Sequence, residues 1–354
     1  MYRVATRDMM NMTGLYELGW KPFFQQQLSL EEWNTTIPGR IINYERSVFS
    51  VRTEKECLVV PVTSGLPAMT VGDWILLDDQ NRFLRLLDRL SVFSRKSPGS
   101  KVSTQLIAAN VDSVFIVSSM NQDFSLNRIE RYLALCHESG AEPVVVLSKS
   151  DLCQNPTDFL SRVQALDSLL TVIGVNSLDP ESVKGLDPWC GKGKTVALLG
   201  SSGVGKSTLV NTLLGRETQA TASIREDDDE GRHTTTRRSL HQLPEGGLLI
   251  DTPGMRELQL SASEEAISST FNDIAQLAEH CHFKNCQHQD EPDCAVLMAI
   301  QSGDLDQRRL DSYHKLLREQ AINEETLAEK RARDRKLGKT YRHAQFAHDR
   351  KRQD

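Results

Sequence analysis

The sequence has no long hydrophobic run and few cysteines. No apolar stretch approaches the ~20 residues that a membrane span requires, and Met1–Asn11 lacks the apolar core of a signal peptide. The 354 residues include only 7 cysteines, an odd number that argues against a disulfide framework. No internal repeat is present. We therefore exclude membrane-spanning, solenoid and disulfide-stabilised proteins, and we expect a soluble, cytoplasmic chain with no membrane partner.

The chain contains enough apolar residues to form hydrophobic cores, and its charge is distributed unevenly along the sequence. Hydrophobic residues make up 39%, and the length suggests two or three domains. The net charge is −6, yet residues 330–354 hold ten Lys/Arg against three Asp, which leaves about −13 for the remainder. The basic end is either a local contact for a polyanion or a solvated helix followed by a disordered tail.

Short alternating apolar runs fill the first third of the chain. They include Arg40–Tyr44, Val48–Val51, Cys57–Val62 and Asp73–Leu77, separated by turn residues. This pattern predicts a small β-barrel or sandwich. The preceding residues are irregular, and Ser97–Ser100 reads as a linker.

After Ala109 strands alternate with helices, which predicts a parallel sheet covered by helices. One amphipathic helix is expected over Asn127–Glu138. Beyond Ser263 the chain turns helical. The expected strands are Ser113–Ser118, Pro143–Leu147, Leu170–Val175, Val196–Leu199 and Leu248–Ile250. The expected fold class is multidomain α/β, divided into residues 1–36, 37–98, 99–262, 263–325 and a basic tail at 326–354.

A glycine-rich run lies between an apolar strand and a helical segment. Its residues are Gly200-Ser201-Ser202-Gly203-Val204-Gly205-Lys206-Ser207, followed by Thr208. Glycines let backbone N–H groups close around phosphates, Lys206 supplies charge to the outer phosphates, and Ser207 offers a hydroxyl to magnesium. The alternative is a chance glycine-rich turn. Since motif and flanks agree, we interpret the run as a nucleoside triphosphate site.

Three more motifs follow predicted strands, where ligands bind in open α/β sheets. Asp251 and Gly254, of Asp251-Thr252-Pro253-Gly254, suit the magnesium shell and the γ-phosphate. In Ser148-Lys149-Ser150-Asp151 the carboxylate would accept N1–H and the 2-amino group of guanine, a donor pair that adenine lacks. Asn176-Ser177 would present backbone N–H to the guanine oxygen. Each motif alone is weak, and their joint placement predicts GTP as the ligand.

A cluster of cysteine and histidine suggests a metal. Cys281, Cys286, His288 and Cys294 offer three thiolates and one imidazole, which is a common closed set for structural zinc. His282 is a fifth ligand to consider, although its neighbour Cys281 already occupies that approach. The alternative is a chance grouping of buried thiols and a surface histidine.

The motif order is unusual, because the base-reading segments precede the phosphate loop. Ordinary small GTPases have the opposite order, so the domain is predicted to be circularly permuted. This order resembles the RsgA (YjeQ) family of ribosome small subunit-dependent GTPases over about residues 37–320. The resemblance also rests on the cysteine cluster and two segments, Gly231–Thr236 and Ile107–Asp112.

The resemblance implies an N-terminal OB-fold, a permuted GTPase domain and a C-terminal helical zinc-binding domain. It further implies GTP hydrolysis, stimulated by the small subunit, during late maturation of that subunit. The expected partners are GTP with magnesium, the small ribosomal subunit and its rRNA, and the chain is expected to be a monomer. The competing hypotheses are a non-catalytic RNA-binding module and an ATP-dependent phosphotransferase.

The chain departs from the family pattern at Ser148, where the base-reading motif usually begins with Asn. We expect weaker anchoring of base and loop, with guanine preference retained through Asp151. By resemblance, Thr235 completes the magnesium coordination with Ser207. Met255 replaces the glutamine that orients water in Ras-like enzymes, and His233 is the candidate for that role. His233 is otherwise a surface histidine in a loop.

A candidate RNA contact of the predicted barrel is formed by five basic residues, Arg82, Arg85, Arg89, Arg95 and Lys96. Many such barrels bind only protein.

Overall fold

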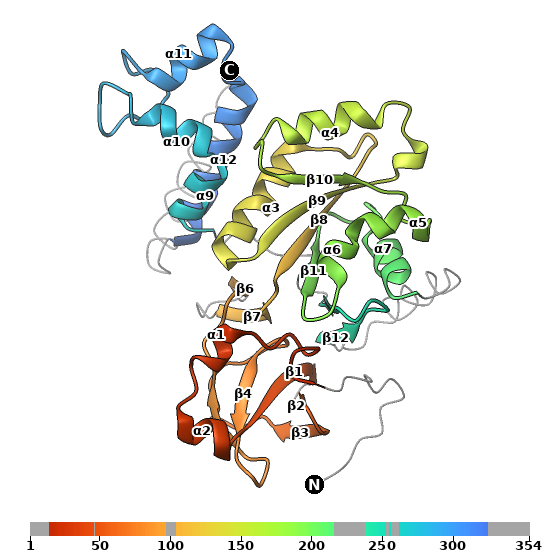
Figure 1. Cartoon of the computed structure of the whole chain (residues 1–354). Coiled ribbons are helices and arrows are strands. Elements are labelled where there is room, and N and C mark those ends of the chain that lie inside the picture. The colour runs from red at the N-terminus through yellow and green to blue at the C-terminus, as the bar shows by residue number, and fades with distance from the viewer. Residues whose placement is uncertain are drawn as a thin grey trace, which may run out of the picture.

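The computed structural model describes residues 14–45, 47–96, 104–215, 238–252, 255 and 262–324. Within these ranges, none of the helices is both long enough and apolar enough to pass through a lipid bilayer. Figure 1 shows a strand-rich part near the N-terminus, a central α/β part, and a group of helices near the C-terminus.

The strand-rich part contains five antiparallel strands around a separate apolar core. Strand β1 is the central element, because it pairs with β2 along its length and with β4 at its start. In β2, buried residues alternate with less buried ones, as expected for an antiparallel sheet with one face in a core. The bounds are β1 Ile37–Glu45, β2 Val48–Thr53, β3 Cys57–Pro61, β4 Trp74–Leu77 and β5 Phe83–Leu86. All four apolar runs expected here are strands.

The central part contains a sheet in the order β10-β9-β8-β11-β13-β12, of which the first five strands are parallel. Every residue of β8 and β11 is buried, which is typical of a parallel sheet covered on both faces. The bounds are β8 Ser113–Ser119, β9 Glu142–Ser148, β10 Thr171–Gly174, β11 Thr195–Leu199, β12 Arg238–Gln242 and β13 Leu248–Asp251. The α/β fold predicted from the alternation is therefore confirmed.

Helices cover both faces of this sheet. On one face, α3 (Leu126–Ser139) and α4 (Pro156–Gln164) contribute Ile129, Leu133 and Val163 to the main core. On the other face, α7 (Lys206–Leu213) contributes Leu209 and Leu213 to a second core, which also receives residues of α5 (Pro180–Val183) and α6 (Asp187–Cys190). The chain runs outward from β8 to β10 and then returns to β11 on the other side of β8. Ligands bind at such a reversal of strand order.

The strand-rich part, which we name the barrel after its predicted fold, and the central sheet are joined by direct strand pairing. The end of β1 pairs antiparallel with β12, with Asn43 opposite Ser239 and Tyr44 opposite Arg238. A short second sheet, β6 (Val92–Lys96) with β7 (Thr104–Ala109), lies between the two parts (Figure 1). The two parts are thus one continuous sheet rather than two bodies on a linker.

Residues 14–36, which the sequence pattern left irregular, form a strap across this junction. Its short helices are α1 (Pro22–Gln25) and α2 (Leu30–Thr35). Trp20 packs edge-on against Trp74 of β4, with ring centroids 4.8 Å apart. Lys21 forms an ion pair with Asp112 beside β8. The strap therefore contacts both the barrel and the α/β part.

The C-terminal helices are α9 Glu264–Thr270, α10 Asn272–Ala278, α11 Ala295–Ser302 and α12 Gln307–Glu324. Helices α9 and α12 pack against α3, and α10 packs against α9 and α11 (Figure 1). Glu130 of α3, which is fully buried, accepts hydrogen bonds from Arg308 (3.0 Å) and Arg309 (2.8 Å) of α12. Arg309 also pairs with Asp273 of α10 at 2.9 Å. A buried charge costs several kcal/mol unless it is paired, so this network requires the helices to stay docked.

Candidate nucleotide site and metal cluster

The phosphate loop begins at a glycine that no other residue could replace. Strand β11 delivers Gly200 with φ +150°, and a Cβ there would lie 2.4 Å from the Val117 carbonyl oxygen of β8. Gly203 and Gly205 have φ +81° and +95°, and α7 starts directly afterwards at Lys206. The loop therefore has the strand–loop–helix geometry in which backbone N–H groups surround a phosphate.

Lys206 is nearly buried and lies along the loop. Its Nζ donates to the Gly200 carbonyl oxygen at 2.7 Å and also contacts that of Ser201. Ser207 and Thr208 follow in the first turn of α7 and are partly exposed. The ammonium group and the Ser207 hydroxyl thus lie at the same end of α7, where the helix dipole favours an anion.

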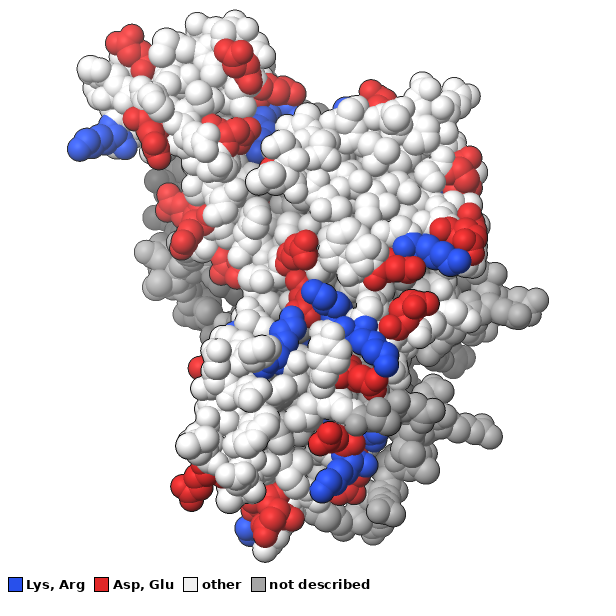
Figure 2. All heavy atoms as spheres, in the orientation of Figure 1, with Lys and Arg blue, Asp and Glu red and all other residues white. Residues whose placement is uncertain are grey.

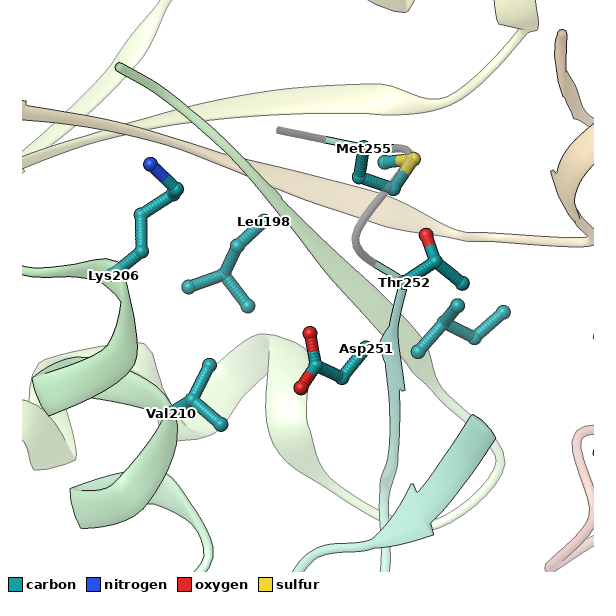
Figure 3. Close-up of a pocket in the computed structure, with 7 residues that line it drawn as sticks. Leu198, Lys206, Val210, Asp251, Thr252 and Met255 are labelled. Atoms are coloured by element: carbon teal, nitrogen blue, oxygen red, sulfur yellow. The ribbon is translucent and has the colours of Figure 1, made fainter. Parts of the chain in front are cut away.

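The end of β13 faces the start of α7 across a small pocket. Figure 3 shows Lys206, Asp251 and Thr252 around it, and Leu198, Val210, Ile250 and Met255 complete its lining. The Thr252 hydroxyl is buried and has no hydrogen-bond partner in the described part of the chain. Met255 is only 2% exposed and belongs to the main hydrophobic core, so its thioether fills space. Gly254, Thr235 and His233 lie outside the described residues.

The last residue of β9 and the residue that follows it hold the phosphate loop from a second side. The Ser148 hydroxyl is fully buried and donates to the Val204 carbonyl oxygen at 2.6 Å. The Lys149 ammonium donates to the Gly203 carbonyl oxygen at 3.0 Å, from a backbone with φ +59°. The serine at position 148 therefore still forms a direct hydrogen bond to the phosphate loop. The carboxylate of Asp151 is exposed on the short 3₁₀ helix that follows, Ser150–Leu152.

The segment after β10 completes this edge of the sheet. The Asn176 side chain accepts from the backbone N–H of Leu178, and the Ser177 carbonyl accepts from Thr212 of α7 at 2.6 Å. A Cβ on Gly205 would lie 3.7 Å from the Ser148 hydroxyl and 3.8 Å from the Ser177 hydroxyl. Ser148 and Ser177 therefore flank the phosphate loop, and the four predicted segments meet at one edge.

Replacing Ser148 with Ala should weaken binding of GDP and GTP by about fivefold. The Val204 carbonyl would lose a buried hydrogen bond worth about 1 kcal/mol, and the loop would be held less well. Isothermal titration with GDP measures the change. Ser161→Ala, at an exposed position of α4, is the matched control and should bind as the unmodified protein does. Equal affinity of Ser148→Ala and this control would contradict the anchoring role.

The four predicted metal ligands converge in the loop between α10 and α11. Their ligand atoms all lie within 4.8 Å of one another. Cys281 Sγ lies 3.8 Å from Cys294 Sγ, and His288 Nδ1 lies 3.4 Å from Cys294 Sγ. A tetrahedral zinc ion with Zn–S bonds of about 2.3 Å places sulfurs about 3.8 Å apart, so the cluster is compatible with structural zinc.

The cluster is built by its local backbone. Cys294 is the N-cap of α11, and its Sγ accepts from the Leu297 backbone N–H. Burial, and secondarily the charge of His314, lower the pKa of His288, which favours the neutral imidazole that binds metal. His282 is exposed and packs on Phe283, outside the ligand set. The zinc ligands predicted from spacing are the ones that the fold brings together.

One cationic contact at the phosphate loop was not predicted from the sequence. Arg128, in the first turn of α3, donates from Nη1 to the Ser201 hydroxyl at 3.3 Å. No motif marks this residue. The only available signal is that α3 starts just after β8, which lies next to β11 in the sheet.

Comparisons with known proteins agree with this geometry. The sequence profile described as RsgA GTPase matches residues 86–261. The chain is 58% identical over 339 residues to small ribosomal subunit biogenesis GTPase RsgA 2 of Vibrio parahaemolyticus, covering 96% of this chain and 94% of that one. It is 44% identical over 315 residues to the RsgA protein of Mesorhizobium japonicum, with 87% and 90% covered.

Two solved structures share the fold. The structure of YjeQ from Thermotoga maritima has a TM-score of 0.60 at 24% identity, covering 81% of this chain and 99% of that one. The structure of YloQ, described as a circularly permuted GTPase, has a TM-score of 0.57 at 25% identity, with 82% and 97% covered.

Proposed function

The chain belongs to the RsgA GTPase family, and we propose that it hydrolyses GTP in late maturation of the small ribosomal subunit, which stimulates the reaction. The observation that carries the proposal is the meeting of four nucleotide motifs at one sheet edge. Ser148 and Lys149 are bonded there to the loop that contains Lys206. The names of the curated relatives support the subunit as the setting.

Phosphoryl transfer requires positioning and charge stabilisation more than covalent chemistry. Lys206 and the loop N–H groups would take the charge on the phosphates. Magnesium, when bound, neutralises the phosphate charge, and the oxygen atoms of Ser207, Asp251 and Thr235 are the ligands that would hold it. Asp251 fits this role because its carboxylate shares a small pocket with Lys206 (Figure 3).

Specificity for guanine would come from the segments after β9 and β10. The exposed carboxylate of Asp151 would accept the paired donors of guanine, and the backbone of Asn176-Ser177 would meet the guanine oxygen. Adenine offers no such donor pair to the carboxylate. A site that leaves a polar group unpaired rejects the wrong ligand strongly.

The attacking water needs a partner other than residue 255, because Met255 is packed into the core. We assign this role to His233, which the subunit would bring into place. His233→Ala should bind GDP within about twofold of the unmodified protein and lose subunit-stimulated turnover. Full stimulated activity of this variant would remove His233 from the mechanism.

Contact with rRNA would fall mainly on the basic tail. Of the four arginines in the candidate RNA contact, two are engaged internally, since Arg85 pairs with Glu32 and Arg89 pairs with the buried Asp73, each at 2.7 Å. On the face in Figure 2, the blue side chains gather mostly where the barrel meets the α/β part, with red ones among them. Residues 330–354, with their excess of seven positive charges, would supply the phosphate contacts, and the protein would act as a cytoplasmic monomer.

The test is turnover of GTP and of ATP with and without purified small subunits. We expect hydrolysis of GTP alone, raised by the subunits. Hydrolysis of ATP at an equal rate would favour a phosphotransferase. GTP binding without turnover, even with subunits, would favour a nucleotide-dependent RNA-binding module.

A further inference from the structure

Three cationic side chains hold the phosphate loop, and they come from three different elements. Lys206 of α7 donates to the Gly200 carbonyl oxygen at 2.7 Å, and Lys149 after β9 donates to that of Gly203 at 3.0 Å. Arg128 of α3 donates to the Ser201 hydroxyl at 3.3 Å. Motifs account for the two lysines, whereas nothing assigns a role to the arginine.

Arg128 lies at the end of the loop that serves the outer phosphates. Its partner Ser201 is also contacted, through the carbonyl oxygen, by the Lys206 ammonium. In a phosphate loop this ammonium reaches the β- and γ-phosphates. The guanidinium of Arg128 therefore ends beside the group that binds the terminal part of a triphosphate.

The Arg128 guanidinium has hydrogen-bond donors that remain unused within the described part of this structure. It is exposed, and its other contact is to the backbone carbonyl of Asp123. No carboxylate of the described residues pairs with it, whereas Arg131 on the same helix pairs with Glu319. A guanidinium carries five donors in a planar fork that matches phosphate oxygens. Two of these donors are used here, which leaves the fork able to bind an anion.

The same helix is fixed from its other side by the C-terminal helix α12. Arg308 donates to Asn127 at 2.9 Å and to the buried Glu130 at 3.0 Å. Asn127 is the immediate neighbour of Arg128, so α12 holds the turn that carries the guanidinium. The contact places Arg308 of α12 against Asn127, the neighbour in sequence of the residue that contacts the phosphate loop.

We propose that Arg128 is a catalytic residue that binds the terminal phosphate of GTP, and that Arg308 of α12 sets its position. The proposal rests on the GTP hydrolysis proposed above. Charge supplied by an arginine at the terminal phosphate stabilises the transition state of phosphoryl transfer, and an arginine finger contributes about 10³-fold or more to turnover. Since Arg128 is exposed and only partly enclosed, we expect a smaller contribution, about 30-fold.

Arg128→Ala should lower kcat for GTP about 30-fold and weaken binding of a non-hydrolysable GTP analogue about tenfold, with GDP affinity changed by less than about twofold. For Arg128→Lys, kcat and analogue affinity should lie between those of Arg128→Ala and the unmodified protein, because the charge remains and the planar fork of donors is lost. Arg318→Ala, at an exposed arginine of α12 that donates to the His314 carbonyl oxygen at 3.1 Å, is the matched control and should behave as the unmodified protein.

Arg308→Ala tests the second half of the proposal. Glu130 keeps its bond to Arg309 in this variant, so the helices should stay docked. We expect kcat to fall about fivefold with GDP affinity unchanged, and the double variant with Arg128→Ala to be no slower than Arg128→Ala alone. Independent, multiplying losses would overturn the link between Arg308 and Arg128.

The outcomes separate the two proposals. If the unmodified protein turns over GTP and Arg128→Ala does so equally fast, with an unchanged ratio of analogue to GDP affinity, the assignment of Arg128 is wrong and the GTPase function stands. An equal loss of affinity for GDP and the analogue would also overturn it, because that result indicates a purely structural support of the loop. Absence of GTP turnover in the unmodified protein would instead reject the proposed function. Thermal unfolding of each variant verifies that it is folded.

Discussion

Replacing Cys294 with Ser should release zinc from the C-terminal part and unfold the segment between α10 and α11. Cys294 is 2% exposed, and its sulfur lies 3.8 Å from Cys281 Sγ and 3.4 Å from His288 Nδ1. These distances allow the three side chains to bind one zinc ion. Structural zinc contributes about 10–16 kcal/mol of apparent binding free energy in small zinc domains, which the loop cannot replace with apolar contacts of its own. The loss should show as a fall from one zinc per chain to nearly none by mass spectrometry of the metal content. Hydrogen exchange of α10 and α11 should rise at the same time.

The control for this variant is Cys57→Ser. Cys57 is a half-buried thiol at the start of β3, in the barrel and outside the ligand cluster. It should keep the zinc and the exchange protection of the helices. GDP affinity should be retained in both variants, because the phosphate loop is anchored by Ser148 and Lys149. Full zinc content in Cys294→Ser would show that the cluster is not a closed metal site.

The sheet and the phosphate loop were predictable because their signals are local. The strands β8, β9 and β11 are runs of apolar residues, and the loop between Gly200 and Ser207 has a fixed spacing. The zinc ligands were predictable for the same reason, since four ligands lie within fourteen residues. In each case a short segment carries most of the information that its structure needs.

The junction between barrel and sheet was not predictable, because it depends on partners distant in sequence. Trp20 has a partner in Trp74, and the end of β1 pairs with β12 almost 200 residues later. Aromatic residues scattered in an irregular segment give no period that would reveal such contacts. Arg128 escaped prediction for a related reason, since its place beside Ser201 follows from the adjacency of β8 and β11.

Helix α3 contacts both the phosphate loop and α12, so it connects the nucleotide site to the C-terminal helices. The motif order suggests that a change at the γ-phosphate shifts the C-terminal helices through the segment that follows Asp251. Residues 253–254 and 256–261 of that segment lie outside the described ranges. A second connection is made by described side chains, from Ser201 through Arg128 and then Asn127 to Arg308. A contact of this kind transmits a shift only if the helix moves as a unit, and the buried Glu130–Arg309 pair favours that behaviour.

The other large effect concerns Arg40, a fully buried arginine of β1 at the junction. Its guanidinium donates to the carbonyl oxygens of Leu18 (2.6 Å) and Asn110 (2.9 Å) and to the Thr195 hydroxyl (2.9 Å), while Nε reaches the Gly72 carbonyl at 3.2 Å. Burial lowers the pKa of Arg40 to about 10, and the charges of Asp112 and Asp73 oppose that shift. One side chain thus joins the strap, the barrel and the first residue of β11.

Arg40→Met should reduce the free energy of unfolding by about 3–5 kcal/mol, measured by urea denaturation. Replacing a buried ion pair with apolar residues is often harmless when both partners are replaced, but the acceptors here are mostly backbone carbonyls that would remain buried and unsatisfied. Arg40→Lys should recover only part of the loss, because an ammonium group cannot reach four acceptors in a planar fork. The fluorescence of Trp20 and Trp74 reports on the site, since the Arg40 guanidinium lies 5.7 Å from the Trp74 ring. Arg318→Met, at an exposed position of α12, should change stability by less than about 0.5 kcal/mol, and a similarly small change in Arg40→Met would mean that the Arg40 hydrogen bonds are not needed to hold the two parts together.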